Sequence, residues 1–342
     1  MIRVVIGTSL VGALALGCAR AAPHVSTGAP VPATRECAWV TSWGGDDVCG
    51  IEVPSGRRLG CVRTGARPHG VAISRDGSRV YVSNEGTNTL TVVDARAGRA
   101  VAEARVGATP NQLALTPDGR HVWVLNNADS SISIVSTETH AIERTVPSGR
   151  GPHIIVMSAT RNAAVVTSEA DASLEVFDLS SYERVSHVPV YGWPRVLAVT
   201  NDGATAFLTI RWLNGALAVS LGGEGPTGRV ALGEPRFARE GKDAHGIALT
   251  PSGSELLITT QVTGVLTFVD TTALERRAEL SVGRDPNWVA LTSDGRFAVV
   301  SNSGDDTASV VDVPSRRLVT SVEVGRQPKR LAVGRCPDGG AS

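Results

Sequence analysis

The chain has 342 residues, and its 33 Lys and Arg balance its 33 Asp and Glu, so the formal net charge is zero. This balance excludes the broad positive field that nucleic-acid binding needs, and it excludes an acidic tail. Aromatic residues make up only 4% of the chain, whereas Gly numbers 37 and Pro 18, which is typical of many short strands joined by tight turns. We therefore expect an all-β protein that does not bind nucleic acid.

The N-terminus has the charged start and the short apolar run, Val4 to Leu16, of a secretory signal rather than of a membrane span. Ala15-Leu16-Gly17-Cys18 resembles a bacterial lipobox, in which cleavage before the cysteine is followed by lipidation, although Ala15 stands where Leu is usual. Ordinary cleavage after Ala21 is the alternative, and it would discard Cys18. The lipobox reading is favoured because Gly17 and Cys18 fit it together.

These features predict four segments along the chain. Residues 1–18 form a signal peptide with a lipobox, residues 19–35 a flexible tether rich in Ala, Pro and Thr, residues 36–339 the folded domain, and residues 340–342 a tail. The expected location is the bacterial cell envelope, either the periplasm or the outer membrane. The only expected membrane contact is the lipid anchor, and the protein is expected to be a monomer.

A repeat of 42 residues organises the rest of the chain. Seven segments align at anchors separated by 42 residues, except for one gap of 50 residues, and such a regular period indicates one repeated structural unit. The anchors are Pro68, Pro110, Pro152, Pro194, Ala244, Pro286 and Pro328.

Each unit carries four short runs of strand-forming residues, which in the first complete unit begin near Gly70, Arg79, Leu90 and Ala100. Between the first two runs, all units except that of Pro152 have a turn pair such as Asp76-Gly77, whose second residue readily takes positive φ. A four-stranded antiparallel sheet cannot bury both of its faces alone, so seven of them are predicted to pack around an axis as a seven-bladed β-propeller.

The segment Tyr81-Val82-Ser83-Asn84, with Trp123-Val124-Leu125-Asn126 at the equivalent place, resembles the motif of the YVTN repeat family. The resemblance covers about residues 37 to 339. The Asn position holds Ser168, Ile210 and Thr260 in three units, so the motif is degenerate there. The resemblance implies a propeller fold, but it does not imply a function, because one propeller family hosts unrelated activities.

The two ends of the chain are expected to share one blade. The N-terminal copy begins at a second strand, Ala38 to Ser42, and the C-terminal copy, Pro328 to Arg335, supplies only a first strand. Aligned on the next repeat, Cys37 and Cys336 face each other across one turn, and Cys49 and Cys61 lie opposite each other on the third and fourth strands. The alignment therefore predicts the disulfides Cys37–Cys336 and Cys49–Cys61, as an exported protein allows.

The residue after each anchor is expected once per blade around one mouth of the central channel, because the first strand lines that channel. All seven are polar, and water in the channel is one explanation. Three are His, which could hold a divalent metal, but the Arg and the Lys favour an anion or a carboxylate instead. The seven candidates for ligand binding are His69, Asn111, His153, Arg195, His245, Asn287 and Lys329, and the weak metal candidates among them are His69, His153 and His245.

Four of the six Trp residues are expected on the same face, and exposed Trp is often a recognition anchor, although packing against a neighbouring loop explains each one equally well. They are Trp43, Trp193, Trp212 and Trp288, whereas Trp39 and Trp123 are expected between blades. Acids such as Asp129, Asp171 and Asp305 should surround this mouth. The eight extra residues of the unit from Pro194 should lie between Gly222 and Lys242, with Glu234 to Lys242 as a flap.

The function expected first is a non-catalytic scaffold of the cell envelope that binds a small anion, a glycan or a peptide at the mouth, or that pairs with an envelope protein. No haem-attachment, nucleophile-elbow, zinc-helix or phosphate-loop motif occurs, and no cofactor is predicted. A propeller lactonase or lyase is the alternative, because its groups come from separate inner strands and leave no local motif. That enzyme would use His69, His153 and His245 with Glu85 or Glu169, with or without a divalent metal.

Overall fold

The computed structural model describes residues 35–337 except residue 224 and residues 234–243. The predicted signal peptide, Cys18, most of the tether, the Glu234 to Lys242 flap and the last residues of the chain lie outside the described residues. Among the described residues, no helix is long and apolar enough to cross a membrane.

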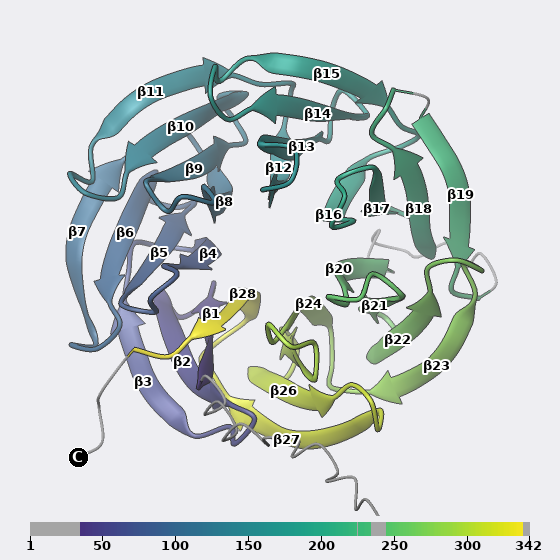
Figure 1. The fold of residues 1–342 in the computed structure, drawn as a ribbon. Coiled ribbons are helices and arrows are strands. Elements are labelled where there is room, and N and C mark those ends of the chain that lie inside the picture. Colours follow the sequence, from purple (N-terminus) through teal and green to yellow (C-terminus); the bar gives the residue numbers. More distant parts are fainter. Residues whose placement is uncertain (1–34, 224, 234–243, 338–342) are drawn as a thin grey trace, which may run out of the picture. The chain divides into compact units, whose positions relative to one another are not determined.

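The described residues form seven four-stranded antiparallel sheets arranged around one axis (Figure 1). The seven-bladed β-propeller predicted from the repeat is therefore confirmed. The innermost strands, which begin at the seven anchors, are β4 (Pro68–Ile73), β8 (Pro110–Leu115), β12 (Pro152–Ser158), β16 (Pro194–Val199), β20 (Ala244–Leu249), β24 (Pro286–Leu291) and β28 (Pro328–Arg335).

Each innermost strand pairs with a second strand, which pairs with a third. The second strands are β1 (Glu36–Ser42), β5 (Arg79–Asn84), β9 (His121–Asn126), β13 (Ala163–Ser168), β17 (Thr205–Ile210), β21 (Glu255–Thr260) and β25 (Phe297–Asn302). The third strands are β2 (Asp47–Val53), β6 (Thr89–Asp94), β10 (Ser131–Ser136), β14 (Ser173–Asp178), β18 (Gly215–Ser220), β22 (Val265–Asp270) and β26 (Thr307–Asp312).

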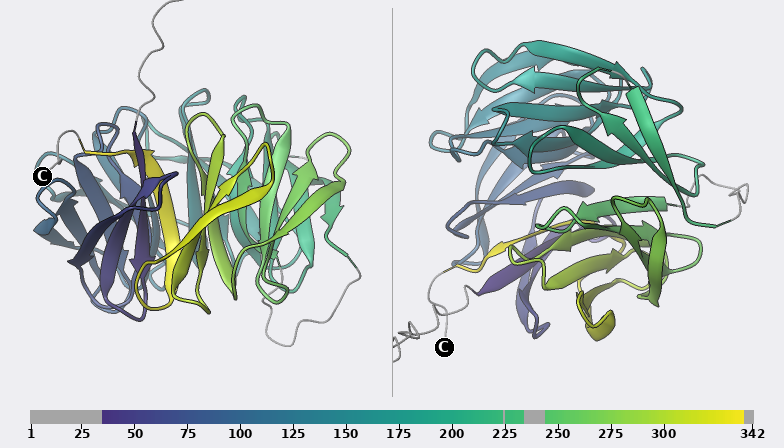
Figure 2. Two further views of the ribbon diagram at one scale, coloured as in Figure 1. Left: turned by 90° about the horizontal axis from the view of Figure 1, so that it is seen from below. Right: turned by 45° about the vertical axis from the view of Figure 1, so that its right-hand side comes forward.

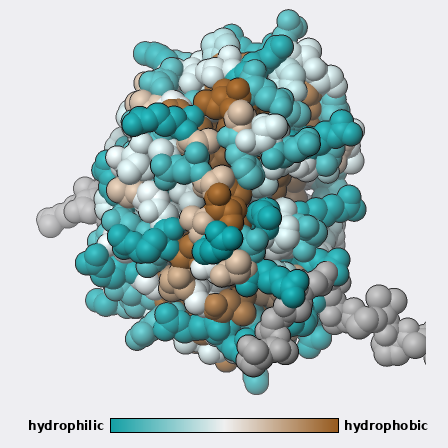
Figure 3. Space-filling model, turned by 90° about the vertical axis from the view of Figure 1, so that its left-hand side faces the viewer, coloured by the Kyte–Doolittle hydropathy of each residue, from teal (hydrophilic) through white to brown (hydrophobic). Residues whose placement is uncertain are grey.

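The fourth strands form the outer edge of the ring, and their residues are mostly exposed. They are β3 (Arg58–Arg63), β7 (Arg99–Arg105), β11 (Ile142–Pro147), β15 (Arg184–Pro189), β19 (Gly225–Ala231), β23 (Arg276–Ser281) and β27 (Arg317–Glu323). The face that carries β7 and β11 is largely hydrophilic with scattered apolar patches (Figure 3), and Val101 and Ile142 are the exposed large apolar residues of these two strands.

Apolar side chains of adjacent blades fill the space between the sheets, which is why a single blade would not be stable alone. Trp123 is fully buried and lies edge-on to Phe177 of the next blade, with ring centroids 6.3 Å apart. Trp39 is 1% exposed within the cluster that joins the first blade to the second. Both Trp residues are thus inter-blade core, as predicted.

The turns between the first and second strands follow the predicted chemistry. Gly77 has φ of 75°, a left-handed conformation that glycine adopts without steric cost, and Asp76 accepts hydrogen bonds from the Ser74 hydroxyl and the Ser78 amide. The Pro152 unit, which lacks the Asp-Gly pair, uses Asn162 with φ of 48° instead. Asn162 stands one position later than the glycine of the other units and directly precedes β13, so this turn differs from the others in shape as well as in sequence.

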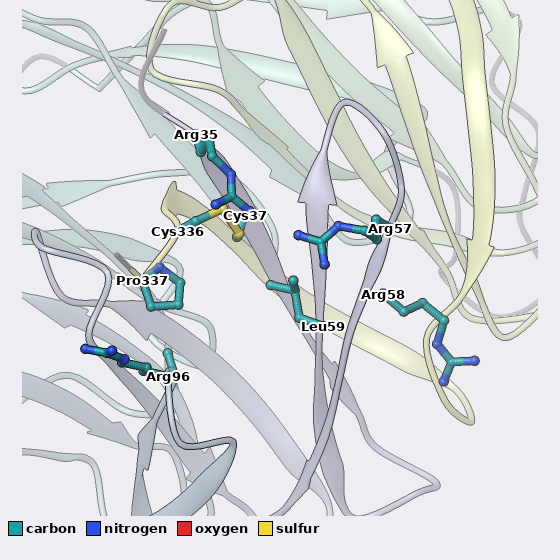
Figure 4. Close-up of a pocket in the computed structure, with 9 residues that line it drawn as sticks. Arg35, Cys37, Arg57, Arg58, Leu59, Arg96, Cys336 and Pro337 are labelled. Atoms are coloured by element: carbon teal, nitrogen blue, oxygen red, sulfur yellow. A yellow bond between two sulfur atoms is a disulfide. The ribbon is translucent and has the colours of Figure 1, made fainter. Parts of the chain in front are cut away.

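The C-terminal strand closes the ring as predicted, because β28 pairs with β1 in the sheet β28-β1-β2-β3. Cys37 at the start of β1 is bonded to Cys336 after β28, and Cys49 of β2 is bonded to Cys61 of β3. Both predicted disulfides are confirmed. Cys37–Cys336 borders a cavity of about 180 Å³ that is also lined by Arg35, Arg57, Arg58 and Arg96 (Figure 4).

The mouth of the axis is the end at which the innermost strands begin. The Trp43 amide at the end of β1 donates to the Gln327 carbonyl just before β28, so the start of β28 and the end of β1 meet there. The disulfide Cys37–Cys336 joins the opposite ends of the same two strands. The disulfide therefore lies on the face away from the mouth, and the ring is closed at both faces by the same strand pair (Figures 1 and 2).

The two disulfides should differ in their effect on stability. Cys37–Cys336 closes a segment with a sequence separation of 299 residues, against 12 for Cys49–Cys61. The chain-entropy model then gives a loss of about 5 kcal/mol for the double variant Cys37→Ala/Cys336→Ala and about 3 kcal/mol for Cys49→Ala/Cys61→Ala. Denaturant unfolding of both variants checks this order. An equal or greater loss in the free energy of unfolding for Cys49→Ala/Cys61→Ala would contradict the larger effect of the ring-closing disulfide.

Candidate functional site

The seven predicted mouth residues each occupy the second position of an innermost strand. At this point the pairing with the second strand is interrupted, for example between Pro68 and Val71 and between Pro152 and Ile155. The mouth residues therefore lie in β-bulges, which commonly redirect side chains next to functional sites. Each anchor is the first residue of its strand, and the mouth residue that follows it is the first residue of the bulge.

In five of the seven blades, a hydroxyl on the second strand holds the bulge to the next blade. Ser83 accepts a hydrogen bond from the Gly70 amide at 2.9 Å and donates one to the carbonyl of Asn111 in the following blade at 2.8 Å. Hydroxyls at the equivalent position reach the next mouth residue in four further blades, and these are Thr41, Thr167, Thr209 and Ser301. The backbone around the mouth is therefore fixed by a repeated side-chain contact.

The three mouth histidines use the same carbonyls. Nδ1 of His69 lies 3.2 Å from the carbonyl oxygen of Asn111, Nδ1 of His153 lies 3.1 Å from that of Arg195, and Nδ1 of His245 lies 2.7 Å from that of Asn287. A carbonyl oxygen only accepts hydrogen bonds, so Nδ1 carries the proton in each ring. The lone pair of each neutral imidazole is then on Nε2.

Arg330 crosses the axis at the mouth. It is 1% exposed, and its Nη2 donates to Nε2 of His153 at 3.2 Å, although β28 and β12 are three blades apart in the ring. Its guanidinium carbon lies 4.2 Å from the ring centroid of Trp288, within the range of a cation–π contact. Nε and Nη1 of Arg330 are buried without a hydrogen-bond partner among the described residues.

Arg195 makes the same kind of contact with the mouth histidine of the adjacent blade. Its Nη2 donates to Nε2 of His245 at 3.3 Å, and its Nε is buried without a hydrogen-bond partner in the described part of the chain. Burial, and then the charge of Arg195, lower the pKa of Arg330 to about 9, so the Arg330 guanidinium is charged at neutral pH. Two Arg side chains with unused donors are thus directed into one buried region.

Two carboxylates face these cations. Oε1 of Glu169 lies 3.5 Å from Nε of Arg195 and 3.8 Å from Nδ1 of His153, and this oxygen has no hydrogen-bond partner among the described residues. Burial raises the pKa of Glu169, and the charge of Arg195 opposes that rise. Oε1 of Glu85 lies 3.7 Å from Nε2 of His69, and its other oxygen accepts from Nε1 of Trp43 at 3.0 Å.

The net charge of this cluster is positive, since Arg195, Lys329 and Arg330 outnumber Glu85 and Glu169. Burial, followed by the nearby Arg and Lys charges, lowers the pKa of all three mouth histidines well below 6.5, so the rings are neutral at pH 7. A buried positive charge with unused donors attracts an anionic group, and the orphaned carboxylate oxygen beside it can accept a proton.

The mouth histidines do not fit a divalent metal. The Nε2 lone pairs of His153 and His245 already accept hydrogen bonds from guanidinium groups, and Arg195 and Arg330 would repel a cation. Among the described residues, the ligand atoms that do gather within 4.8 Å of one another belong to Asp47, Cys49 and Cys61, and both cysteines are in a disulfide.

The structure places the other predicted residues around this cluster. The amide oxygens of Asn111 and Asn287 are buried without a partner in the described region, and Nζ of Lys329 lies 5.7 Å from the ring centroid of Trp43. Trp193 and Trp212 form a pair with centroids 5.9 Å apart. The acids of the rim have a different role, because Asp129, Asp171 and Asp305 accept hydrogen bonds from the backbone amides of neighbouring loops.

Sequence reasoning did not include Arg330 among the mouth residues. The sequence did contain a signal, because the other repeats hold the uncharged residues Gly, Gln, Ile, Val, Gly and Trp at this position, and a single Arg in such a series stands out. Strict alternation assigns neighbouring strand residues to opposite faces, but the bulge breaks that alternation and brings both Lys329 and Arg330 to the axis.

Comparison with known proteins finds a family model that matches part of the chain. The family model "Lactonase, 7-bladed beta-propeller" matches residues 60–143. Among curated proteins, none matches the chain.

Solved structures resemble the whole propeller. The periplasmic gluconolactonase of Pseudomonas aeruginosa is 20% identical, with a TM-score of 0.71, over 89% of this chain and 100% of that one. A putative 6-phosphogluconolactonase of Bacteroides fragilis is 15% identical, with a TM-score of 0.72, over 90% and 99%. The hydrazine synthase of Kuenenia stuttgartiensis is 19% identical, with a TM-score of 0.72, over 80% and 92%. At these identities the structures show a shared fold.

The expectation of a non-catalytic scaffold is wrong in the light of these matches. The family model that matches is a lactonase model, and several of the similar structures are titled as lactonases. The physical reason for the error is that the absence of contiguous motifs carries little weight in a propeller. Its candidate groups, such as His153, Glu169, Arg195 and Arg330, come from different strands and meet only at the axis.

The buried histidines predict an acid-dependent loss of stability. Since their folded-state pKa values lie well below 6.5, the unfolded chain binds protons that the folded chain excludes, and the free energy of unfolding falls as pH drops below about 6.5. At pH 5.5 each histidine accounts for about 1.4 kcal/mol. Glu169 has a raised pKa, so its contribution to the free energy of unfolding changes in the opposite direction and rises as the pH falls.

The comparison of His245→Gln with the wild type isolates one histidine. Denaturant unfolding at pH 7.5 and at pH 5.5 should show that the wild type loses about 1.4 kcal/mol more than the variant between the two pH values. Equal losses in the two proteins would mean that His245 is not held neutral in the fold.

Proposed function

We propose that this protein is a lactonase-type hydrolase that opens an anionic lactone at the mouth of the propeller axis. The observation that carries the proposal is Arg330, a buried cation that crosses the axis to His153 with two unused donors and interacts electrostatically with Glu169, whose Oε1 has no hydrogen-bond partner among the described residues. The match of residues 60–143 to the lactonase model supports the reaction class. The positive charge of the cluster supports a substrate that bears a carboxylate or a phosphate.

The proposed chemistry uses only side chains of this chain. A water molecule attacks the lactone carbonyl carbon while Glu169 accepts its proton, and the negative charge on the carbonyl oxygen is stabilised by the unused donors of Arg330. The ring carbon–oxygen bond then breaks, and the alkoxide takes the proton from Glu169, giving one hydroxy acid per water consumed. Arg195 binds the anionic group of the substrate, and His153 holds the Arg330 guanidinium in place through Nε2.

The setting of each group fits its proposed role. Glu169 has a raised pKa and is therefore a stronger base than an exposed carboxylate, while the charge of Arg195 opposes that rise and favours the ionised form. The side chain of Glu169 is only 13% exposed, so few water molecules compete for its oxygen. Arg330 is held on three sides by Trp288, His153 and the bulge of β28, so its donors are preorganised.

The remaining predictions about this chain belong with this proposal. The contacts of Asn84, which holds the hydroxyls of Thr89 and Thr91 at 3.0 and 2.8 Å, support assigning the repeats to the YVTN type. The two disulfides support export, since such bonds persist in oxidising compartments. We propose a monomer in the bacterial periplasm that acts on a small molecule, and palmitate labelling lost in Cys18→Ser would establish the lipid anchor.

The substitution Glu169→Gln should abolish hydrolysis without unfolding the protein. Removal of a general base reduces kcat by about 10²- to 10⁴-fold. The assay is pH-stat titration of glucono-δ-lactone, glucuronolactone and 6-phosphogluconolactone, and Glu103→Gln on the exposed strand β7 is the control. Full activity in Glu169→Gln, or no catalysed opening of any of the three lactones by the wild type, would count against the proposal.

The pH profile should report the environment of Glu169. Its carboxylate must be ionised to accept a proton, so activity falls as pH drops through its raised pKa. The charge of Arg195 lowers that pKa, so Arg195→Gln should move the acid limb of the kcat profile to higher pH. An acid limb that stays in place in Arg195→Gln would show that another group titrates.

A further inference from the structure

The blade formed by β16 to β19 departs from the other six at its mouth loops. Trp212 occupies a loop position at which the other repeats hold only small or β-branched residues. These equivalents are Gly44, Gly86, Ala128, Ala170, Val262 and Gly304. A large aromatic residue at one of seven equivalent positions is not required by the fold, because six blades form without it.

The backbone of the same two loops is also different. Trp212 has φ of 65°, a left-handed conformation that is rare for a bulky residue. In the six other blades the left-handed residue of this loop falls two positions later, as at Asn88 and Ser130. In other blades, the residue directly before the anchor proline has positive φ, as at Arg67 and Thr109. In this blade Gly192 has positive φ instead, and Trp193, which precedes the proline, does not. Left-handed bulky residues also occur in other turns of this chain, such as Tyr182 and Leu274, so the departure at Trp212 is its position within the loop.

These departures bring two indole rings and one cation together. The centroids of Trp193 and Trp212 lie 5.9 Å apart, and the guanidinium carbon of Arg211 lies 5.3 Å from the first and 4.6 Å from the second. The Arg211 amide donates to the Trp193 carbonyl at 2.9 Å and so ties the two loops to each other. We call these three residues the aromatic platform.

The aromatic platform is open to solvent and borders the proposed site. Trp193 is 41% exposed and Trp212 is 53% exposed, which is unusual for Trp in a chain with so few aromatic residues. Arg211 directly precedes Trp212, and its charge acts on both Glu169 and Arg195. Trp193 is separated from Arg195 by the anchor Pro194 alone. A ligand that occupies the mouth would therefore extend over these rings.

We propose that the aromatic platform is a subsite for an acidic sugar residue, so that the substrate is a lactone joined to an acidic glycan. The apolar face of a sugar ring packs on an exposed indole, and Arg211 supplies donors for a carboxylate and for hydroxyls. An acyl chain is disfavoured, because it needs an enclosed apolar groove rather than two open rings beside a cation. The choice of substrate rests on the proposed function, whereas the sugar binding does not.

Isothermal titration of the full chain with trigalacturonate and with maltotriose tests this subsite. The wild type should bind trigalacturonate more tightly than maltotriose. Trp212→Ala should weaken trigalacturonate binding about tenfold, as expected for loss of a stacked aromatic anchor, and Trp212→Phe should retain most of it. Arg211→Gln should reduce the preference for the acidic sugar. Val262→Ala, the equivalent position in the next blade, should bind like the wild type.

The outcomes separate this inference from the proposed function. Binding of neither saccharide, equal binding by the wild type and Trp212→Ala, or equal affinity for the two saccharides would overturn the subsite, even if Glu169→Gln loses hydrolysis. Conversely, if trigalacturonate binding depends on Trp212 while the wild type opens no lactone, the subsite stands and the proposed function fails.

Discussion

The mouth of this propeller depends on one repeated contact, in which the carbonyls of six of the seven mouth residues accept hydrogen bonds from the preceding blade. The Asn111 carbonyl accepts from the Ser83 hydroxyl and from Nδ1 of His69, and the Arg195 carbonyl accepts from Thr167 and from His153. The contact joins neighbouring blades and fixes the proton of each imidazole on Nδ1. Folding and the protonation state of the site are therefore set by the same bonds.

The neutral imidazoles that result make room for two buried cations. A charged histidine beside Arg195 or Arg330 would add repulsion to the cost of desolvation, whereas a neutral ring offers Nε2 as an acceptor. Even so, Arg330 keeps two donors without partners among the described residues, and one oxygen of Glu169 has no hydrogen-bond partner there. Unused buried polar groups destabilise a fold, and their concentration at the axis is the main reason to assign the activity there.

Much of the architecture could be predicted from the sequence because a repeat supplies its own alignment. The anchors fixed the number of blades, the incomplete copies at residues 36 and 328 predicted the closing strand, and the aligned cysteines predicted both disulfides. The bulges were not predicted, because interrupted pairing leaves no pattern in a run such as Pro328 to Leu331. Arg330, which reaches the axis through such a bulge, was missed for that reason.

The character of the site could not be predicted from local motifs. His153 and Arg330 are 177 residues apart in the chain and meet only because the ring closes. The pairing of Trp193 with Trp212 depends on which residue of each loop takes positive φ, and Gly192 and Trp212 do so at positions where the other repeats give no precedent. Comparison of each loop with its six equivalents, rather than with known motifs, reveals these residues.

A crystal structure of the protein with gluconate, the ring-opened acid of glucono-δ-lactone, tests the central claim most directly. The account predicts a carboxylate within hydrogen-bond distance of the unused donors of Arg330 or Arg195, next to Oε1 of Glu169. Gluconate bound at another face, or a mouth in which Arg330 does not reach His153, would contradict it.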